Sequence, residues 1–332
     1  MSTSKQTKAK RRALLIGIRY VDQKGEETPN HLGGCWNDVD RMNSILQTYF
    51  GFDANDITIM KDVPDNFNGK LYPTKANVQH MIKKLIKHSH AGDTLFFSYS
   101  GHGTQIKDIN SDEKKEMAID SDTGKVNVSS DSGRPVTKRG SDEAMCAWNG
   151  TDIENISDDS LHRWMVTDLK KGVSLRAFFD CCCSGSILDI PYRYSCVQDS
   201  ETMVNVGRPS EGKTDDIGWL EDLTAEDTRF KDSASKDVLI ISGCRDPESS
   251  MDVSFSGIRY GALTYMMNKL VERCFKVQKP VTLPDGKVMA PHIFTWYTFI
   301  TNLYLYVAKD FPSQNPQLST SNKKLLLQPI TL

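Results

Sequence analysis

The sequence predicts an α/β protein with a mostly parallel central sheet flanked by helices. Two short apolar runs, 93–99 and 173–179, have the β-branched and aromatic content of buried strands, and each ends abruptly in small and polar residues. Elsewhere in the first half, strand-like and helix-like runs alternate, as in a parallel sheet covered by helices. Because the carboxyl ends of parallel strands gather at one edge, we expect the functional residues there.

The remaining elements follow in chain order. The apolar runs 13–18 and 57–60 are predicted strands, Asn37 is expected to cap a helix, and Pro73-Thr74 to open an amphipathic one. Asp158-Asp159 is expected to cap the helix that leads into the second buried run. We then expect a strand at 238–241, helices at about 261–275 and 294–309, and a hairpin within 276–291.

Composition limits the class of protein. The chain has 332 residues, of which 38% are hydrophobic, and a formal net charge of −2. This is ordinary globular composition with no reason to propose nucleic acid as a partner, and no apolar run reaches membrane-spanning length. We expect one domain over 13–332 after a short basic tail over 1–12, which is interpreted as solvated in preference to a nuclear signal.

Cysteine usage and polar segments complete the outline. Eight cysteines show no paired secretory framework, so a cytoplasmic protein with reduced thiols is expected, with access to the nucleus left open. From 106 to about 156 the chain is polar and weakly periodic, and we expect an inserted surface loop there, centred on 106–141. A second long surface loop is expected at 194–236.

The two buried runs carry the chemistry. The first is followed by Ser100-Gly101-His102-Gly103, which leaves the imidazole exposed between glycines, and the second by Asp180-Cys181-Cys182-Cys183. If the strands are neighbours, an imidazole and a thiol meet at one edge, the arrangement of an activated sulfur nucleophile. Taken singly, the histidine could be a turn residue and the cysteine a packed thiol.

The joint pattern resembles the metacaspases, a family of cysteine peptidases with a caspase-like fold. Beyond the two strand-end motifs, the resemblance includes Gly34-Cys35-Trp36-Asn37-Asp38, the Asp158-Asp159 helix start, Ile187-Leu188-Asp189-Ile190-Pro191-Tyr192 and Ile241-Ser242-Gly243-Cys244, all in the family's order. It covers most of 12–270. It implies a three-layer sandwich, with a mostly parallel central sheet between helices.

The resemblance also implies roles at the strand ends. His102 would be the general base and Cys182 the nucleophile, with backbone N–H groups of Gly103 and Cys182 as candidates for the oxyanion hole. The chain departs from the family at Cys183, where a histidine usually follows the nucleophile. This departure affects the expected rate, pH profile and sensitivity to oxidants, because adjacent thiols can form disulfide or sulfenic products.

Metacaspases cleave after Arg or Lys, so the resemblance implies an acidic specificity pocket and peptide substrates with a basic residue before the scissile bond. Asp38 and Asp180 match the family's pocket carboxylates, with Cys35 and Ser100 as pocket walls. A carboxylate facing a guanidinium makes a charge-assisted, bidentate contact. Asp38 could alternatively serve only as a first-turn helix residue that complements the helix dipole.

Calcium activation is implied in the same way. Asp158, Asp159 and Asp189 match the family's calcium site, and Asp142 is our choice for the fourth ligand, although Ser111-Asp112-Glu113 has a similar local sequence. Clustered carboxylates suit Ca²⁺, which takes hard oxygen ligands in irregular geometry. The alternative for Asp159 is simple N-capping.

The family comparison further implies a monomer that cleaves itself within 194–236. The basic residues of that segment are Arg208, Lys213, Arg229 and Lys231. Two rival functions stay open: a non-catalytic module with the same fold that binds or regulates, and a thiol-based metal or redox protein using Cys181, Cys182 and Cys183. Loss of peptidase activity on Cys182→Ala dismisses the first, and stoichiometric zinc supports the second.

Overall fold

A computed structural model gives the structure of the chain. It describes residues 9–107, 116–117, 137–138, 141–182, 184–185, 187–195, 221–222, 233, 235–244, 251–255, 257–277, 281–282, 288–289 and 294–330.

A mixed eight-stranded sheet forms the centre of the molecule, in the order β11-β10-β17-β12-β9-β3-β1-β2. The neighbours from β12 to β2 run parallel, whereas β17, β10 and β11 are added antiparallel. The strands are β1 (Arg11–Gly17), β2 (Ile57–Lys61), β3 (Thr94–Ser100), β9 (Ser174–Asp180), β10 (Tyr192–Ser195), β11 (Glu221–Asp222), β12 (Asp237–Ser242) and β17 (Gln317–Thr320). The predicted parallel centre is therefore confirmed, and the antiparallel extension was not foreseen.

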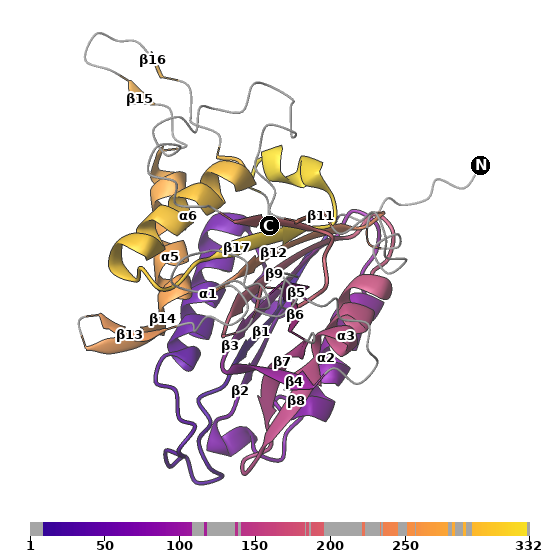
Figure 1. The fold of residues 1–332 in the computed structure, drawn as a ribbon, viewed down its shortest axis with the longest axis vertical. Helices are drawn as coiled ribbons and strands as arrows, with labels where there is room; N and C mark the ends of the chain where they lie inside the picture. Colours follow the sequence, from indigo (N-terminus) through magenta and orange to yellow (C-terminus); the bar gives the residue numbers. More distant parts are fainter. Residues whose placement is uncertain are drawn as a thin grey trace, which may run out of the picture.

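Helices cover both faces of this sheet, which gives the expected three layers (Figure 1). One face carries α1 (Cys35–Phe50), α5 (Ala262–Val277) and α6 (Trp296–Asp310). The other carries α2 (Lys75–Lys87) and α3 (Asp158–His162), which continues into the π-helical turn η3 (Arg163–Thr167). The described residues also contain three 3₁₀ turns: η1 (Ala54–Asp56), η2 (Pro64–Asn66) and η5 (Lys323–Leu327).

The central strands β1, β3, β9 and β12 are largely apolar because both of their faces are buried. In β1, Leu14 and Ile16 pack on the α2 side while Ala13 and Leu15 pack on the α1 side, as the alternation of a strand requires. None of the helices in the described ranges has the length and apolar character needed to cross a membrane.

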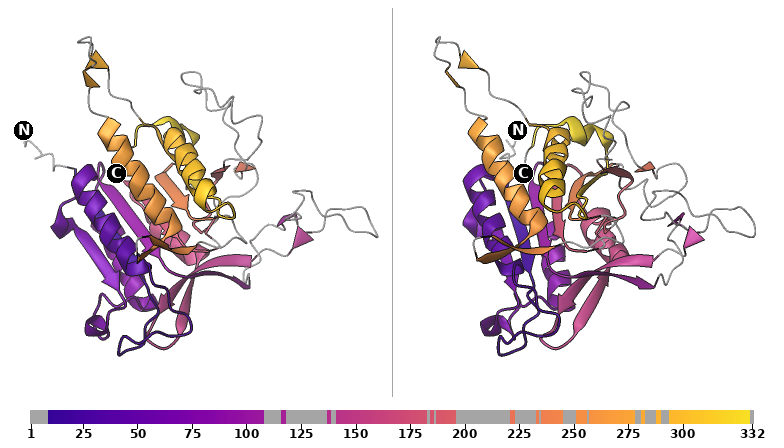
Figure 2. Two further views of the ribbon diagram at one scale, coloured as in Figure 1. Left: turned by 90° about the vertical axis from the view of Figure 1, so that its left-hand side faces the viewer. Right: turned by 60° about the vertical axis from the view of Figure 1, so that its left-hand side comes forward.

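A second sheet corrects the predicted loop over 106–156. It has the order β4-β7-β8, with β4 (Gly103–Lys107), β7 (Ser141–Trp148) and β8 (Ile153–Ser157), and extends from the end of the central sheet that carries the strand ends (Figures 1 and 2). Most of β7 is buried, but its alanine, methionine, cysteine and tryptophan lack the β-branched signature of a strand. Only part of the expected loop falls within the described residues, including the short pair β5 (Glu116–Met117) and β6 (Thr137–Lys138).

Two hairpins and two helix caps complete the comparison with the sequence. The predicted hairpin within 276–291 contains β15 (Val281–Thr282) and β16 (Val288–Met289), and a further hairpin, β13 (Asp252–Phe255) and β14 (Ile258–Gly261), precedes α5. Helix α1 starts at Cys35 with Gly34 as its N-cap, so Asn37 does not cap it. The N-cap of α3 is Ser157, whose side chain accepts from the Ser160 N–H, which leaves both aspartates in the first turn.

Candidate active site

The two predicted strand ends lie side by side. Strands β3 and β9 pair in parallel with Ser100 opposite Asp180, and His102 and Cys182 each lie two residues further along. The loops touch, because a Cβ on Gly103 would lie only 2.0 Å from the carbonyl oxygen of Cys182. Glycine is therefore required at 103, and the backbones that carry the imidazole and the thiol meet at one edge of the sheet.

The imidazole of His102 has a defined hydrogen-bonding state. Its Nε2 lies 2.8 Å from the carbonyl oxygen of Asn30, in the loop between β1 and α1. A carbonyl can only accept, so Nε2 carries the hydrogen, and in the neutral ring Nδ1 is then the unprotonated nitrogen. The loop carbonyl thus fixes the tautomer in which Nδ1 is free to act as a base.

Two buried tyrosines hold the backbone of His102. The Tyr20 hydroxyl accepts from the His102 N–H at 2.7 Å, and the Tyr99 hydroxyl donates to the His102 carbonyl at 2.7 Å. The Tyr20 ring also packs on the imidazole at 4.6 Å between centroids, and its hydroxyl donates to the Cys146 carbonyl at 2.8 Å. Tyr20 has a φ of 58°, a backbone conformation that is unusual for a bulky residue. Burial raises the pKa of both hydroxyls well above the usual range, so both stay neutral.

Among the cysteines that the structure describes, Cys182 alone is not buried. Cys181 is 1% exposed, and its carbonyl accepts from the Cys244 thiol at 3.4 Å. Burial raises the pKa of the Cys181 thiol well above its usual value, which disfavours the reactive thiolate there. The thiol at 182 is therefore the one that a substrate can reach, while Cys183 lies outside the described residues.

The four predicted pocket residues come together on the α1 side of the sheet. The Ser100 hydroxyl donates to Asp38 Oδ2 at 2.6 Å, and the Gly261 N–H donates to both oxygens of Asp38 at 3.0 Å. The backbone N–H and hydroxyl of Thr264, at the start of α5, donate to Asp180 Oδ2 at 2.8 and 2.7 Å. Burial, followed by the charge of Asp180, raises the pKa of Asp38 well above its usual value.

Cys35 completes the group as a wall residue. It is 4% exposed, and burial together with Asp38 raises the pKa of its thiol well above the usual value. A neutral thiol at this position supplies volume rather than charge.

A third carboxylate, Asp252 on β13, joins this pocket and was missed from the sequence. Its Oδ2 accepts from the Gly33 N–H at 2.8 Å, and its buried Oδ1 has no hydrogen-bond partner among the described residues. Its charge contributes to the raised pKa of both Asp38 and Cys35, so it faces the same space. The signal in the sequence that could have indicated Asp252 was its acidic side chain in the segment that follows the strand end Ser242-Gly243-Cys244. We call Asp38, Asp180 and Asp252 the pocket carboxylates.

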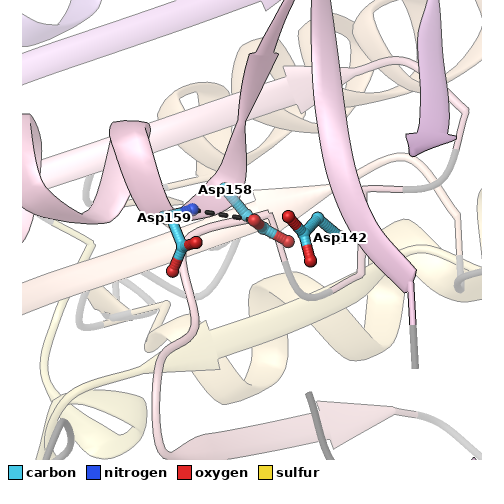
Figure 3. A group of neighbouring side chains, drawn as sticks. All are labelled: Asp142, Asp158 and Asp159. Atoms are coloured by element: carbon cyan, nitrogen blue, oxygen red, sulfur yellow. Dashed lines mark hydrogen bonds between the residues drawn. The ribbon is translucent and has the colours of Figure 1, made fainter. Parts of the chain in front are cut away.

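A separate acidic cluster lies where β7 meets the start of α3. One carboxylate oxygen from each of Asp142, Asp158 and Asp159 falls within 4.8 Å of the others (Figure 3). The Glu143 and Asp159 N–H groups each donate to Asp158 at 2.7 Å. Burial and the charge of Asp189 raise the pKa of Asp158 to about 10. We call Asp142, Asp158 and Asp159 the β7–α3 carboxylates.

Three of the four predicted calcium ligands thus form one group. The fourth, Asp189, has a left-handed φ of 44° and lies close enough for its charge to raise the pKa of Asp158. Oxygen donors that can all approach one point fit a hard cation such as Ca²⁺. The alternative segment Ser111-Asp112-Glu113 lies outside the described residues.

Comparison with known proteins identifies the family. The family described as "Metacaspase, peptidase C14 domain" matches residues 11–132 and 123–191. The chain belongs to the metacaspases. Its curated relatives include Metacaspase-1 of Ajellomyces capsulatus, 32% identical over 277 residues, and Metacaspase-1A of Aspergillus fumigatus, 34% identical over 277 residues. The resemblance inferred from the strand-end motifs is confirmed.

The relatives are longer than the aligned region. Both alignments cover 77% of this metacaspase, but 69% of the Ajellomyces protein and 60% of the Aspergillus protein. The crystal structure of a protein from Geobacter sulfurreducens superimposes with a TM-score of 0.52, covering 96% of this chain and 97% of its own, at 21% identity. That likeness supports the fold alone, whereas family membership supports a cysteine peptidase.

Proposed function

We propose that this metacaspase is a calcium-dependent cysteine endopeptidase that cleaves after Arg or Lys, with Cys182 as nucleophile and His102 as general base. The observation that carries the proposal is the paired ends of β3 and β9, where a partly exposed thiol and an imidazole with a fixed tautomer follow strands in register. A thiol with a nearby base is the requirement for nucleophilic sulfur catalysis.

The mechanism follows from the tautomer. Nδ1 of His102 takes the proton of the Cys182 thiol, and the thiolate attacks the substrate carbonyl, with the N–H groups of Gly103 and Cys182 as donors to the oxyanion. The C–N bond then breaks, and the imidazolium returns its proton to the leaving amine. Water, activated by the same nitrogen, hydrolyses the thioester. The Asn30 carbonyl supports the imidazolium throughout, because it accepts from Nε2.

Preference for a basic residue is supported by the pocket carboxylates. Three carboxylates share a buried space, where neutral donors from Ser100, Gly261 and Thr264 orient two of them. Arg259, 3.9 Å from Asp252 and 57% exposed in its side chain, is a cation at the mouth of this space. Buried carboxylates favour an incoming cation, and the guanidinium of arginine can bridge two of them.

Calcium dependence is supported by the β7–α3 carboxylates together with Asp189. These residues would hold Ca²⁺, whose positive charge would neutralise acids that otherwise repel one another. Asp189 lies seven residues after Cys182, so ordering of the acidic cluster also orders the segment that follows the nucleophile. This link gives a physical route from cation binding to the active site.

Self-processing, a monomeric state and a cytoplasmic location belong to the same proposal. The four basic residues at which self-cleavage is expected, between 208 and 231, lie outside the described residues. Mass spectrometry after incubation with calcium tests this part, and an intact chain would contradict it.

The main test is hydrolysis of a fluorogenic peptide ending in Arg, with millimolar calcium or with chelator. We expect calcium-dependent turnover in the wild type and in Cys274→Ala, a buried cysteine of α5 outside the site, and none in Cys182→Ala or His102→Ala. Absence of turnover from folded, reduced wild-type protein at every calcium concentration would overturn the proposal in favour of a non-catalytic module.

A further inference from the structure

A hollow lies on the side of His102 away from the pocket carboxylates. It has a volume of about 350 Å³, at the lower end of the range for ligand pockets, which is room enough for a side chain. Its lining residues come from the β1–α1 loop, the β3–β4 turn, β4, β7 and β8: Asn30, His102, Gly103, Thr104, Cys146, Ile153 and Asn155. Asn30, His102 and Gly103 also serve the proposed peptidase chemistry, whereas Thr104, Ile153 and Asn155 have no role in that chemistry or in the calcium site.

The hollow and the pocket carboxylates lie on opposite faces of the central sheet. Cys146, in the wall of the hollow, packs with Tyr20 and Trp148 in the core on the α2 side. Asp38 lies on α1 and is bonded by Gly261, immediately before α5, on the other face. A peptide that crosses the sheet edge at Cys182 and His102 would therefore have one pocket on each side of its scissile bond.

The direction of proton transfer indicates which of the two pockets receives the leaving-group side of the substrate. When the C–N bond breaks, the acyl part stays on the Cys182 sulfur and the amine leaves with a proton from His102. The residue that begins with this amine must lie beside the imidazole. The imidazole is part of the wall of the hollow, so the hollow lies on the side of the leaving group.

We propose that this hollow binds the side chain of the residue that follows the scissile bond and selects an uncharged one. The inference rests on the proposed peptidase function. Ile153 and Asn155, two apart on β8, share one face of that strand and offer an apolar contact and a carboxamide. The Asn155 Oδ1 accepts from the Cys146 thiol at 3.6 Å, which leaves its amide N–H groups as donors.

Charge of either sign is disfavoured in the hollow. None of the described lining residues is a carboxylate, so a basic side chain would lose water without gaining an opposite charge. A basic side chain is also repelled by the imidazolium formed during catalysis. An acidic one stabilises that imidazolium and so opposes return of its proton to the leaving amine.

The test uses internally quenched peptides with Arg before the scissile bond and Ser, Asp or Lys after it. For the wild type we expect kcat/KM to be about fivefold higher or more for Ser than for either charged residue, a fold-change typical of about 1 kcal/mol. The side chain of Ile153 is 37% exposed at the start of β8, so a charge can be introduced there without disturbing the core.

Two variants of opposite charge make the test specific. Ile153→Glu should raise the Lys/Asp ratio of kcat/KM about fivefold, and Ile153→Lys should lower it by a similar factor. Leu305→Glu, the same kind of change at an exposed residue of α6, should leave the ratio unchanged. Circular dichroism establishes that each variant is folded.

The outcomes separate the two proposals. Cleavage of the Arg peptides with a Lys/Asp ratio that stays the same in both folded Ile153 variants would overturn this inference alone. If the wild type cleaves none of the peptides at any calcium concentration, the proposed function fails and this inference fails with it.

Discussion

The pocket carboxylates and the β7–α3 carboxylates are two groups of buried or half-buried acids with different geometry. Among the described residues, only the β7–α3 carboxylates bring three ligand atoms within 4.8 Å of one another. The pocket carboxylates come from α1, β9 and β13 and are oriented by separate donors, a hydroxyl, a hairpin N–H and a threonine. Convergent oxygens suit a compact ion, whereas separated ones suit the extended fork of a guanidinium.

Both groups of acids lower the stability of the folded protein when they are ionised. Burial and neighbouring carboxylates raise the pKa of Asp38 and of Asp158, so ionised acids in both places weaken the folded state until a cation arrives. On the proposed function, each site accepts this loss of stability in order to bind a cation of a different shape. Substrate selection and cation activation should then be open to independent change.

The largest effect is expected for Asp180→Asn. The amide keeps the shape and can still accept from Thr264, but it removes the charge that a guanidinium would meet. We expect kcat/KM for an Arg peptide to fall about 100- to 1,000-fold, as for loss of one partner of a buried charged pair. The calcium concentration for half-maximal stabilisation should not change, and Asp65→Asn, an exposed acid of η2, serves as the control. An equal loss of calcium response would show that the two groups are not separate.

The reverse experiment is Asp158→Asn. Loss of one charged ligand that also receives two backbone N–H groups should weaken calcium binding about 10- to 100-fold, measured by titration calorimetry and by the calcium-induced rise in melting temperature. The Arg/Lys ratio of kcat/KM at saturating calcium should stay at the wild-type value. A changed ratio would contradict the independence of the two sites.

The raised pKa of Asp38 predicts how stability and binding of a cationic ligand change with pH. Because the pKa of its carboxyl is raised, the folded protein keeps a proton that the unfolded chain releases above the usual value of 3.8. Asp38 should therefore contribute a fall in the free energy of unfolding of at most about 1.4 kcal/mol per pH unit as pH rises above that value. Asp38→Asn should remove this contribution, while the contribution of Asp158 remains. Binding of benzamidine, an amidinium probe, needs the ionised form, so its affinity should rise with pH by at most about tenfold per unit. A pH-independent inhibition constant below neutral pH would contradict this assignment.

Asp252 is expected to favour arginine over lysine in the proposed specificity pocket. The free Oδ1 is a second attachment point that the planar guanidinium can reach together with another carboxylate, whereas an ammonium is a point charge. Asp252→Asn should lower the Arg/Lys ratio of kcat/KM about fivefold to tenfold, the range of one charge-assisted hydrogen bond. Arg259→Ala removes the cation that lies 3.9 Å from Asp252 and competes with the substrate, so it should lower the KM for Arg peptides. Equal losses for both substrates on Asp252→Asn would mean that Asp252 only supports Gly33.

The sequence patterns predicted those parts of the site that side-chain types encode locally. The apolar runs of β3 and β9 indicated neighbouring strands, and His102 and Cys182 followed from the residues at their ends. The carbonyl of Asn30 could not be predicted, because any residue offers a carbonyl and only the path of the loop brings this one to the imidazole. Asp252 depends likewise on a short hairpin without periodicity.

The errors have a common physical origin. Strands β7 and β8 were predicted as loop because their partners are supplied by the fold, through β4, and not by a strong strand pattern. The cap of α3 moved by one residue to Ser157, which leaves Asp158 free for the β7–α3 carboxylates. Pairing between segments that are distant in the sequence therefore formed the strands β7 and β8, which their amino-acid composition alone does not predict.

The smallest effect is expected for Tyr20, which holds His102 and, among the described residues, hydrogen-bonds to neither acidic group. Tyr20→Phe keeps the ring against the imidazole but leaves the buried His102 N–H without its acceptor, so the base should be held less firmly. We expect kcat to fall about fivefold, the effect of about 1 kcal/mol, with KM, the Arg/Lys ratio and the calcium response unchanged. The pH dependence of Cys182 alkylation by iodoacetamide should shift as well, because it reports how well His102 supports the thiolate. A lowered melting temperature with an unchanged kcat and alkylation profile would mean that the tyrosine only stabilises the fold.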